Sequence, residues 1–593
     1  MKRMQVARKS DKLTNVVLLG AAALLLYIGW REFWFITDDA YIAFRYVSNS
    51  IHGLGYVWNP APFQAVEGYT SFLWVVILET VWRVFGAEPP KAANTISLIF
   101  SFGTIIVTAI AAMKMKLTPQ LERLRHTLVV LVVGGLLINP AFHTWASSGL
   151  ETALFNFCLL CWVVSVILIQ EKGHWWRLAV TGTAALTYLA RPDGVLMVGG
   201  TAVLVALSFI DDTRQRKISL KWCGTILPLL IPVVHLIWRR SFYGEWLPNT
   251  YYAKQVAAWP EAGIRYFLSF LIEYGVWFWI IVIAVALVKL FKELRRGGNW
   301  HGIGPLSHNN NRVCVGIAVT VVIVHWGYYT FIVGGDHFEW RVYSQLFPLL
   351  SLSFLFALRA LNLSATKAVM AVILMIALSL PIPWTYHMTE RRITYVPLAN
   401  TLKLTAGDKI PFLVSPLAEV QDSLQSWLTD HLICIRRQKH KLFFENQVRV
   451  YPERTFDVPP QVGRFPVANL STVGVPGWTL PNIAIIDGYG LNDYIVARTP
   501  VVQGKERRMA HDRLAPEHYL ATFVPNVRLT GVKSIDYSAR PPELELTADK
   551  IKAIEQYWED KIVRKMNIPD SVAPWPISIN ADSLARHNNE ITP

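Results

Sequence analysis

The stretch TISLIFSFGTIIVTAIAAM, residues 95–113, carries no charged side chain over its whole length. About twenty consecutive apolar residues are enough for a helix to cross the hydrocarbon core of a bilayer. Ten other stretches have a similar character, so we predict a polytopic α-helical membrane protein with about eleven transmembrane helices. The ten are 14–30, 127–140, 150–170, 177–190, 194–210, 223–238, 267–291, 313–332, 342–358 and 366–386.

The composition of the 593-residue chain agrees with this prediction, because 53% of the residues are hydrophobic and only 17% are charged. Soluble proteins are about 25% charged, and a soluble chain of this length would need several domains with polar shells. An ordinary soluble enzyme and a disordered chain are therefore excluded. The net charge of +15 fits Lys and Arg gathered in cytoplasmic loops better than a nucleic-acid partner, and we expect no nucleic acid.

Basic segments set the expected orientation of the chain. The N-terminal tail and the loops 114–126, 211–222 and 292–312 are the most basic, and such segments face the cytoplasm. All of them can do so only if the short apolar run 71–86, which contains Glu79 and Arg83, does not cross the membrane. We therefore expect 71–86 to lie on the outer membrane surface as a helix.

With that orientation the C-terminus is extracytoplasmic. Residues 1–386 then form a transmembrane domain whose first outer loop is 31–94, and residues 387–593 form a soluble domain outside the membrane. Strand-like stretches at 483–486 and 494–497 favour an α/β or β-rich fold for the soluble domain. The pair Cys158 and Cys161 has C-x-x-C spacing but lies in an apolar run without a second pair, so we expect no metal or redox cofactor.

Polar residues collect in the predicted outer loops, which indicates a cavity at the outer face. Asp38 and Asp39 come soon after the first span, and a carboxylate is the usual base for a sugar hydroxyl. The cations that could bind a phosphate are Arg45, Arg191, Lys254 and Arg341. A structural alternative is that Arg191 pairs with Asp193, and Asp336 with Arg341.

The energy for a transfer reaction is expected to come from the substrate itself. Neither a P-loop pattern nor a Rossmann G-x-G-x-x-G pattern is present, and nucleotide donors are not normally available outside the cytoplasm. A polyprenyl-phosphate sugar carries its own activated bond and sits in the bilayer. Such a lipid-linked donor fits an outer-face cavity with a carboxylate and several cations.

The first-loop motif resembles a known family. Asp38-Asp39-Ala40-Tyr41-Ile42-x-Phe44-Arg45-Tyr46, followed by Glu67-x-Tyr69-Thr70-Ser71-x-Leu73-Trp74, is similar to the first outer loop of bacterial arabinofuranosyltransferases, in particular the AftB-like terminal β-(1→2)-arabinofuranosyltransferases of the mycobacterial cell wall. The later motifs that resemble the same family are Arg191-Pro192-Asp193-Gly194, Tyr243-Gly244-x-x-Leu247-Pro248-Asn249-Thr250 with Lys254, Gly334-Gly335-Asp336 with Arg341, and Asp487-x-x-Gly490-Leu491-x-Asp493 with Ala497-Arg498.

The resemblance implies a GT-C glycosyltransferase fold in a bacterial cytoplasmic membrane, with the active site at the outer face. It implies a polyprenyl-phosphoryl arabinofuranose donor and a cell-envelope glycan or glycoconjugate as acceptor. Catalysis is carried over to Asp38 and Asp39 jointly, and donor phosphate binding to Arg191 and Arg341, together with Lys254 and Arg45. The residues expected to contact the sugar or the acceptor are Glu67, Tyr69, Asp193, Asn249, Asp336 and His337.

Other functions stay open at this point. The transferred sugar could be one other than arabinofuranose, and the acceptor could be an arabinan, a lipopolysaccharide or a surface protein. A transporter or flippase of lipid-linked glycans would normally carry charge near mid-membrane, where Glu151 and His235 are the nearest candidates. A glycan-binding scaffold could use a patch around His511 and Tyr519. Asp38, Asp39 and His337 could also meet at a metal, but their spacing does not predict one.

Overall fold

The computed structural model describes residues 2–169, 173–214, 220–295, 309–394, 402–406, 415–502, 504–569 and 572–575. The loop residues Arg216, Lys217 and Arg296, which contributed to the predicted orientation, lie outside the described residues. The chain divides into two compact units. The first unit contains 1–35, 93–233 and 258–439, and the second contains 36–92, 234–257 and 440–593.

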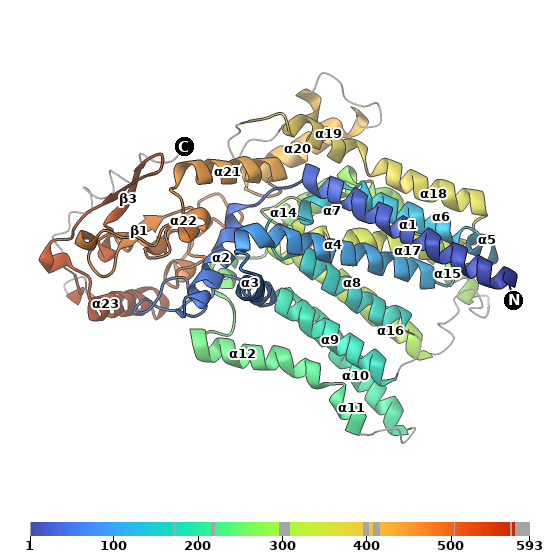
Figure 1. The fold of residues 1–593 in the computed structure, drawn as a ribbon, viewed down its shortest axis with the longest axis horizontal. Coiled ribbons are helices and arrows are strands. Elements are labelled where there is room, and N and C mark those ends of the chain that lie inside the picture. The colour runs from blue at the N-terminus through green and yellow to red at the C-terminus, as the bar shows by residue number, and fades with distance from the viewer. Residues whose placement is uncertain are drawn as a thin grey trace. The chain divides into compact units, whose positions relative to one another are not determined.

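The first unit is built from helices, which Figure 1 labels along the chain. Those before residue 234 are α1 (Lys2–Glu32), α4 (Pro89–Lys114), α5 (Pro119–Glu122), α6 (Arg125–Leu137), α7 (Pro140–Trp145), α8 (Thr152–Leu168), α9 (His174–Ala190), α10 (Val195–Arg214) and α11 (Leu220–Gly224). Those after it are α14 (Pro260–Glu273), α15 (Val276–Arg295), α16 (Asn309–Gly327), α17 (Leu346–Leu361), α18 (Ala365–Leu378), α19 (Pro381–Glu390) and α20 (Ser415–Asp430).

Many of these helices are membrane-spanning candidates, so the chain is a multi-pass membrane protein. Within the described ranges six helical stretches are long and apolar enough to cross a bilayer. They are Pro89–Lys114, Pro192–Ile210, Trp222–Tyr243, Val313–Val333, Arg341–Leu361 and Ala365–Glu390, and each contains or overlaps a predicted span. The bent pair α14 and α15 raises the number to seven. The predicted total of eleven stays a prediction.

One predicted span, 267–291, is not a single straight helix. The apolar run 267–291 is broken between α14 and α15, which meet at 89°. Gly275 lies at the break with φ +61°, in the left-handed region that favours glycine. The sequence is apolar through the bend, so hydropathy alone predicts a continuous helix there.

Small residues allow the helices of the first unit to pack closely. Helices α8, α9 and α10 lie side by side in chain order (Figure 1). Thr181, Ala184 and Ala185 of α9 are buried, and such short side chains let helix backbones approach. Helix α6 is only 13 residues long, but it packs among the apolar helices α17 and α18, where Leu128 and Val132 join their core.

The second unit combines helices with short strands. Its helices are α2 (Asp38–Ile51), α3 (Phe72–Phe85), α13 (Asn249–Lys254), α22 (Gly474–Thr479), α23 (Ala548–Trp558) and, for the greater part, α12 (Leu230–Tyr243) and α21 (Arg437–Val450). Strands β1 (Val467–Leu470) and β2 (Ala484–Asp487) pair in parallel, with Val467 opposite Ala484. Strands β3 (Val527–Gly531) and β4 (Ser534–Tyr537) form an antiparallel pair with an irregularity between Leu529 and Gly531.

The strand expectation for the C-terminal part is half right. Residues 483–486 largely coincide with β2, whose four residues are all buried. Residues 494–497 do not form a strand, because a 3₁₀ turn covers Val496–Arg498. The carboxylate of Asp493 accepts a hydrogen bond from the backbone N–H of Val496, at 2.9 Å, and this local bond favours a turn.

The compact units do not follow the predicted boundary at residue 386. The second unit takes in the first outer loop, including the predicted helix 71–86, which forms as α3 over Phe72–Phe85. The first unit extends to residue 439. Which of these parts lies in the membrane and which outside stays a prediction.

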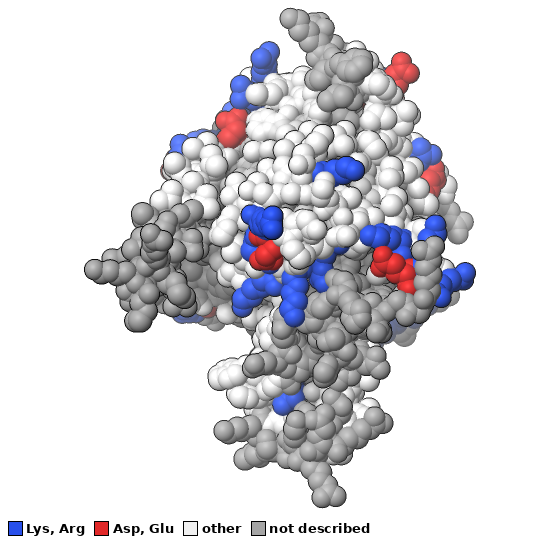
Figure 2. All heavy atoms as spheres, turned by 90° about the vertical axis from the view of Figure 1, so that its right-hand side faces the viewer, with Lys and Arg blue, Asp and Glu red and all other residues white. Residues whose placement is uncertain are grey.

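Basic side chains gather on the face shown in Figure 2, where more Lys and Arg than Asp and Glu are visible. Exposed Lys114 ends α4, exposed Lys116 and Arg123 follow that helix, and exposed Lys292 and Arg295 lie in the last turn of α15. These residues belong to the first unit and to loops that were expected to face the cytoplasm. A basic face of this kind is typical of the cytoplasmic side of a membrane protein.

Candidate active site

Asp38 and Asp39 form the first turn of α2, where carboxylates are favourable next to the helix N-terminus. Asp38 is buried, and its two oxygens accept hydrogen bonds from the backbone N–H groups of Gly474, at 3.1 Å, and Val475, at 2.7 Å. Burial, with Asp39 adding to it, raises the pKa of Asp38 to about 7, although the two N–H donors act in the opposite direction. Asp38 therefore ties α2 to the start of α22.

Asp39 has a different environment. Its side chain is half-buried, and among the residues that the structure describes it forms neither a hydrogen bond nor an ion pair. The charges of Asp39, Lys254 and Asp487 all act on the imidazole of His511. Burial lowers the pKa of His511, and its Nδ1 lies 2.8 Å from the carbonyl oxygen of Met509. Asp39, Lys254 and His511 are thus one electrostatic neighbourhood within the second unit.

Two motifs far apart in the sequence meet beside Lys254. The side-chain amide of Asn249 donates to the backbone carbonyls of Gly490 and Asp493, at 2.9 and 3.0 Å. Its oxygen accepts from Arg498, at 2.9 Å, and Arg498 also pairs with Glu245. The Arg498 guanidinium lies over the ring of Tyr494. Asn249 thus has its hydrogen bonds within the protein, and it positions α13 rather than presenting a free amide to a sugar.

The Asp487 motif shapes the adjoining loop. Its carboxylate accepts from the backbone N–H groups of Tyr489, Gly490 and Asn492. Burial raises the pKa of Asp487, against these donors. The ring of Tyr489 stands edge-on to His511, with 4.8 Å between centroids. The motif therefore holds Tyr489 against His511.

Three predicted ligand-binding residues of the first loop are buried and already paired. The Arg45 guanidinium donates to the carbonyls of Trp58, Gly477, Leu480 and Ile483 and to the side chain of Asn59. These bonds engage all three of its nitrogens, so no donor is left for a phosphate. Glu67 forms a buried ion pair with Arg239, and the Tyr69 hydroxyl lies 3.3 Å from that of Tyr243. The three residues hold the first loop in place.

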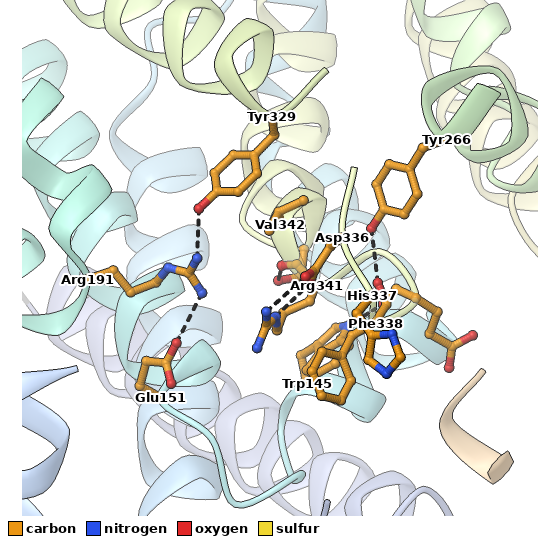
Figure 3. A network of polar contacts seen from close by, with 12 residues as sticks. Trp145, Glu151, Arg191, Tyr266, Tyr329, Asp336, His337, Phe338, Arg341 and Val342 are labelled. Carbon is orange, nitrogen blue, oxygen red and sulfur yellow. Dashed lines mark hydrogen bonds and ion pairs between the residues drawn. The ribbon is translucent and has the colours of Figure 1, made fainter. Parts of the chain in front are cut away.

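The first unit contains a separate charged cluster, shown in Figure 3. Arg191 donates to Glu151 at 3.0 Å, to Asp193 at 3.2 Å and to the hydroxyl of Tyr329 at 2.7 Å. The second oxygen of Asp193 accepts from Tyr329 and lies 2.9 Å from His325 Nε2. Burial opposes the charge of Arg191, but Asp193 and Glu151 keep its pKa well above the usual range.

Asp336 and Arg341 complete this cluster. They form a bidentate ion pair of 2.7 and 2.9 Å, and the Arg341 guanidinium lies over the ring of Phe338. The charge of Arg191 acts on Arg341, so the two ion pairs are neighbours, as Figure 3 also shows. The Nδ1 atom of His337 lies 2.7 Å from the carbonyl oxygen of Leu432.

The charges of the cluster decide what it can bind. Arg191 and Arg341 face three carboxylates, those of Glu151, Asp193 and Asp336. A phosphate would have to break these ion pairs and would meet more carboxylates than guanidinium groups. The structural alternative, in which Arg191 pairs with Asp193 and Asp336 with Arg341, is the arrangement present. Phosphate binding by Arg191 and Arg341 stays a prediction.

The suggested metal set is not assembled within either unit, because His337 belongs to the first unit and Asp38 and Asp39 to the second. No group of three His, Cys, Asp or Glu side chains suited to a metal ion occurs in the described part of the chain.

Several partners were not predicted from the sequence. His325 and Tyr329 lie inside an apolar run and Arg239 directly follows one, so all three are easily taken for structural residues, yet each binds a carboxylate. The rule that an ionisable side chain inside an apolar helix has a partner could have pointed to Arg239 and His325.

No protein-family model matches the chain. In the solved structures, the crystal structure of ArnT from Cupriavidus metallidurans bound to undecaprenyl phosphate shows a loose likeness. The TM-score is 0.48 at 12% sequence identity, covering 90% of this chain and 99% of that chain.

Curated relatives match in sequence. A terminal β-(1→2)-arabinofuranosyltransferase of Corynebacterium glutamicum is 26% identical over 366 residues, which are 57% of this chain and 50% of the relative. The enzyme of the same name from Mycobacterium tuberculosis is 27% identical over 287 residues, 46% of this chain and 43% of the relative. The chain spans about half the length of the curated relatives it matches. The resemblance of this chain to the terminal β-(1→2)-arabinofuranosyltransferases is thereby confirmed.

Proposed function

We propose that this protein is a membrane glycosyltransferase that transfers a sugar, arabinofuranose, from a polyprenyl-phosphate donor to a cell-envelope glycan or surface glycoconjugate. The sequence similarity to two arabinofuranosyltransferases carries this proposal. The open carboxylate of Asp39 supports it, as does the charge of Lys254, which acts with that of Asp39 on His511, because the reaction needs a base and a cation. The outer face of a bacterial cytoplasmic membrane is the proposed site of the reaction.

In the proposed reaction Asp39 accepts the proton of an acceptor hydroxyl. The hydroxyl oxygen forms a bond to the anomeric carbon of the donor sugar, and the bond from that carbon to the phosphate oxygen breaks. The polyprenyl phosphate leaves with the electron pair, so charge moves from the carboxylate to the leaving group. Lys254 is exposed at the end of α13, where it can stabilise the departing phosphate.

We assign Asp38 a positioning role in the same helical turn. Both of its oxygens are held by α22, whereas Asp39 is free to meet a hydroxyl. Neighbouring residues of a helix point about 100° apart, so one carboxylate can be anchored while the other faces a substrate.

The test is direct transfer by the purified full-length protein. Polyprenyl-phosphoryl arabinofuranose is mixed with a panel of glycan acceptors, and released polyprenyl phosphate is measured by mass spectrometry. Asp39→Asn should lower the rate by a factor of about a hundred or more while the melting temperature stays unchanged. Because we expect no metal cofactor, a chelator should leave the wild-type rate unchanged.

The other outcomes separate the remaining functions. Release only from mannose, glucose or aminoarabinose donors would keep the transferase and change the sugar. Movement of a lipid-linked glycan across vesicles without a new glycosidic bond would instead support a transporter. Full activity of Asp39→Asn would remove Asp39 as the base.

A further inference from the structure

A small cavity in the first unit belongs to neither cluster described above. Its volume is about 20 Å³, and it is partly open. It lies where the ends of several helices meet, among them α7, α14 and α19. Its lining combines three glutamates and two arginines with aromatic rings; the polar residues on which the argument depends are Glu273, Glu339, Glu390, Tyr386, Arg436 and Arg437.

Two of the glutamates, Glu273 and Glu339, are paired with one arginine. Glu273 forms two hydrogen bonds of 2.8 Å with Arg436, and Glu339 lies 3.2 Å from the same guanidinium. Glu273 also accepts from the indole of Trp340, at 3.1 Å. This network fixes Arg436 at the wall of the cavity, over the ring of Tyr386.

Three polar atoms of the lining are not satisfied. Glu390 Oε1, Tyr386 Oη and Arg436 Nε are buried without a hydrogen-bond partner among the residues that the structure describes. Glu390 and Tyr386 are 6% and 3% exposed. Buried polar atoms in native proteins nearly always have a partner, and three orphans around one cavity indicate that something else occupies it.

The three atoms without a partner determine which hydrogen-bond donors and acceptors the occupant must carry. Glu390 Oε1 requires a donor and Arg436 Nε–H requires an acceptor, and one hydroxyl group provides both. Glu273, Glu339 and Glu390 disfavour an anion, while Arg436 and Arg437 disfavour a cation, so the occupant is neutral. One water needs about 10–15 Å³ on this scale, so the cavity has room for about two non-hydrogen atoms. Phe33 and Tyr274 contribute aromatic rings to the lining, and such rings suit the C–H groups of a sugar.

We infer that this cavity is a carbohydrate subsite that receives the hydroxymethyl group of a pentofuranose, with Glu390, Tyr386 and Arg436 binding its hydroxyl. The identity of the sugar rests on the proposed function. The group could come from the donor sugar or from an acceptor residue, and both present the same chemistry.

The probes are methyl arabinofuranoside and its 5-deoxy analogue, which lacks the hydroxyl. Binding to the full-length protein in detergent is followed by saturation-transfer NMR. The wild type should bind the parent sugar about tenfold or more tightly than the analogue, as expected for a hydrogen bond to a charged group. Glu390→Gln and Tyr386→Phe should each reduce or remove that preference and leave binding of the analogue unchanged.

Control variants keep the test specific. Glu390→Gln should fold, because the oxygen it replaces makes no hydrogen bond in the protein, and an unchanged melting temperature verifies this. Glu419→Gln, exposed on α20, should retain the full preference. Equal binding of the two sugars by the wild type would show that the cavity holds only water, and would overturn the inference.

Turnover distinguishes this inference from the proposed function. Hydroxyl-dependent binding without release of polyprenyl phosphate from any donor would contradict the proposed function but support the carbohydrate subsite. Release of polyprenyl phosphate without hydroxyl-dependent binding would support the proposed function but overturn the subsite. Competition of methyl arabinofuranoside with the lipid-linked donor would assign the subsite to the donor sugar, and competition with the glycan would assign it to the acceptor.

Discussion

Asp38 and Asp39 are neighbours in the chain, yet their carboxylates meet different surroundings. Both carboxylate oxygens of Asp38 accept hydrogen bonds from the backbone of α22, whereas the carboxylate of Asp39 has no hydrogen bond to the described residues. A carboxylate that already accepts two N–H bonds is a poor site for a substrate hydroxyl. The different surroundings of Asp38 and Asp39 therefore depend on residues that lie more than four hundred positions away in the sequence.

The first prediction concerns Asp38 and pH. Its carboxyl has a pKa of about 7 in the folded protein against 3.8 ordinarily, so the folded state binds this proton more tightly. Its contribution to stability is full below pH 3.8, falls as the pH rises through about 7, and is then constant. The wild type should lose up to a few kcal/mol relative to Asp38→Asn across that window. Melting temperatures of both proteins at pH 4.5, 6, 7 and 8 test this, and parallel curves would contradict it.

The second prediction contrasts two cations that the sequence treats alike. Lys254 is exposed, and its charge acts on His511 as that of Asp39 does, so Lys254→Ala should raise KM for the lipid donor about tenfold without moving the melting temperature. Arg45→Lys should lower the melting temperature instead, because a lysine offers three donors where five bonds are made. Its remaining folded fraction should keep the wild-type KM. A raised KM for Arg45→Lys alone would reverse the assignment.

At the scale of elements, length separates α3 from the long apolar helices. Its 14 residues extend about 21 Å, short of a hydrocarbon core of about 30 Å. Glu79 pairs with Arg83 one turn later and accepts from Ser50. Exposed Val84 and Phe85 give the end of the helix an apolar surface. These features favour the predicted position on the membrane surface.

The bend between α14 and α15 provides the third prediction. A Cβ on Gly275 would lie 2.8 Å from the Cβ of Leu378 and 3.0 Å from its carbonyl oxygen, at φ +61°. Gly275→Ala should cost roughly 1–3 kcal/mol in unfolding free energy. Gly182→Ala in α9, where an added Cβ has open space, should be neutral or slightly stabilising. Thermal unfolding of both variants gives the answer, and equal effects would show that the bend tolerates a side chain.

At the scale of the whole molecule, the prediction concerns the orientation of the chain in the membrane. Reporters fused after Lys116 and after Ile393 should read cytoplasmic and extracytoplasmic, respectively. The basic residues after α4 and at the end of α15 motivate the first result. Alkaline phosphatase, active only outside, and a fluorescent protein, active only inside, make the measurement. The opposite pattern would mean that α3 crosses the membrane after all.

The sequence by itself determined the membrane class, most of the long apolar helices, the acidic turn at Asp38 and Asp39, and the family resemblance. Hydropathy, charge bias and short motifs are local properties of a chain, so they can be read without coordinates. Only the tertiary structure decided that Arg45 is a scaffold residue, that Arg191 and Arg341 are paired with carboxylates, that the chain bends at Gly275, and that Asp39 is the open carboxylate. Pairing and burial depend on which distant segments meet, and no local pattern contains that information.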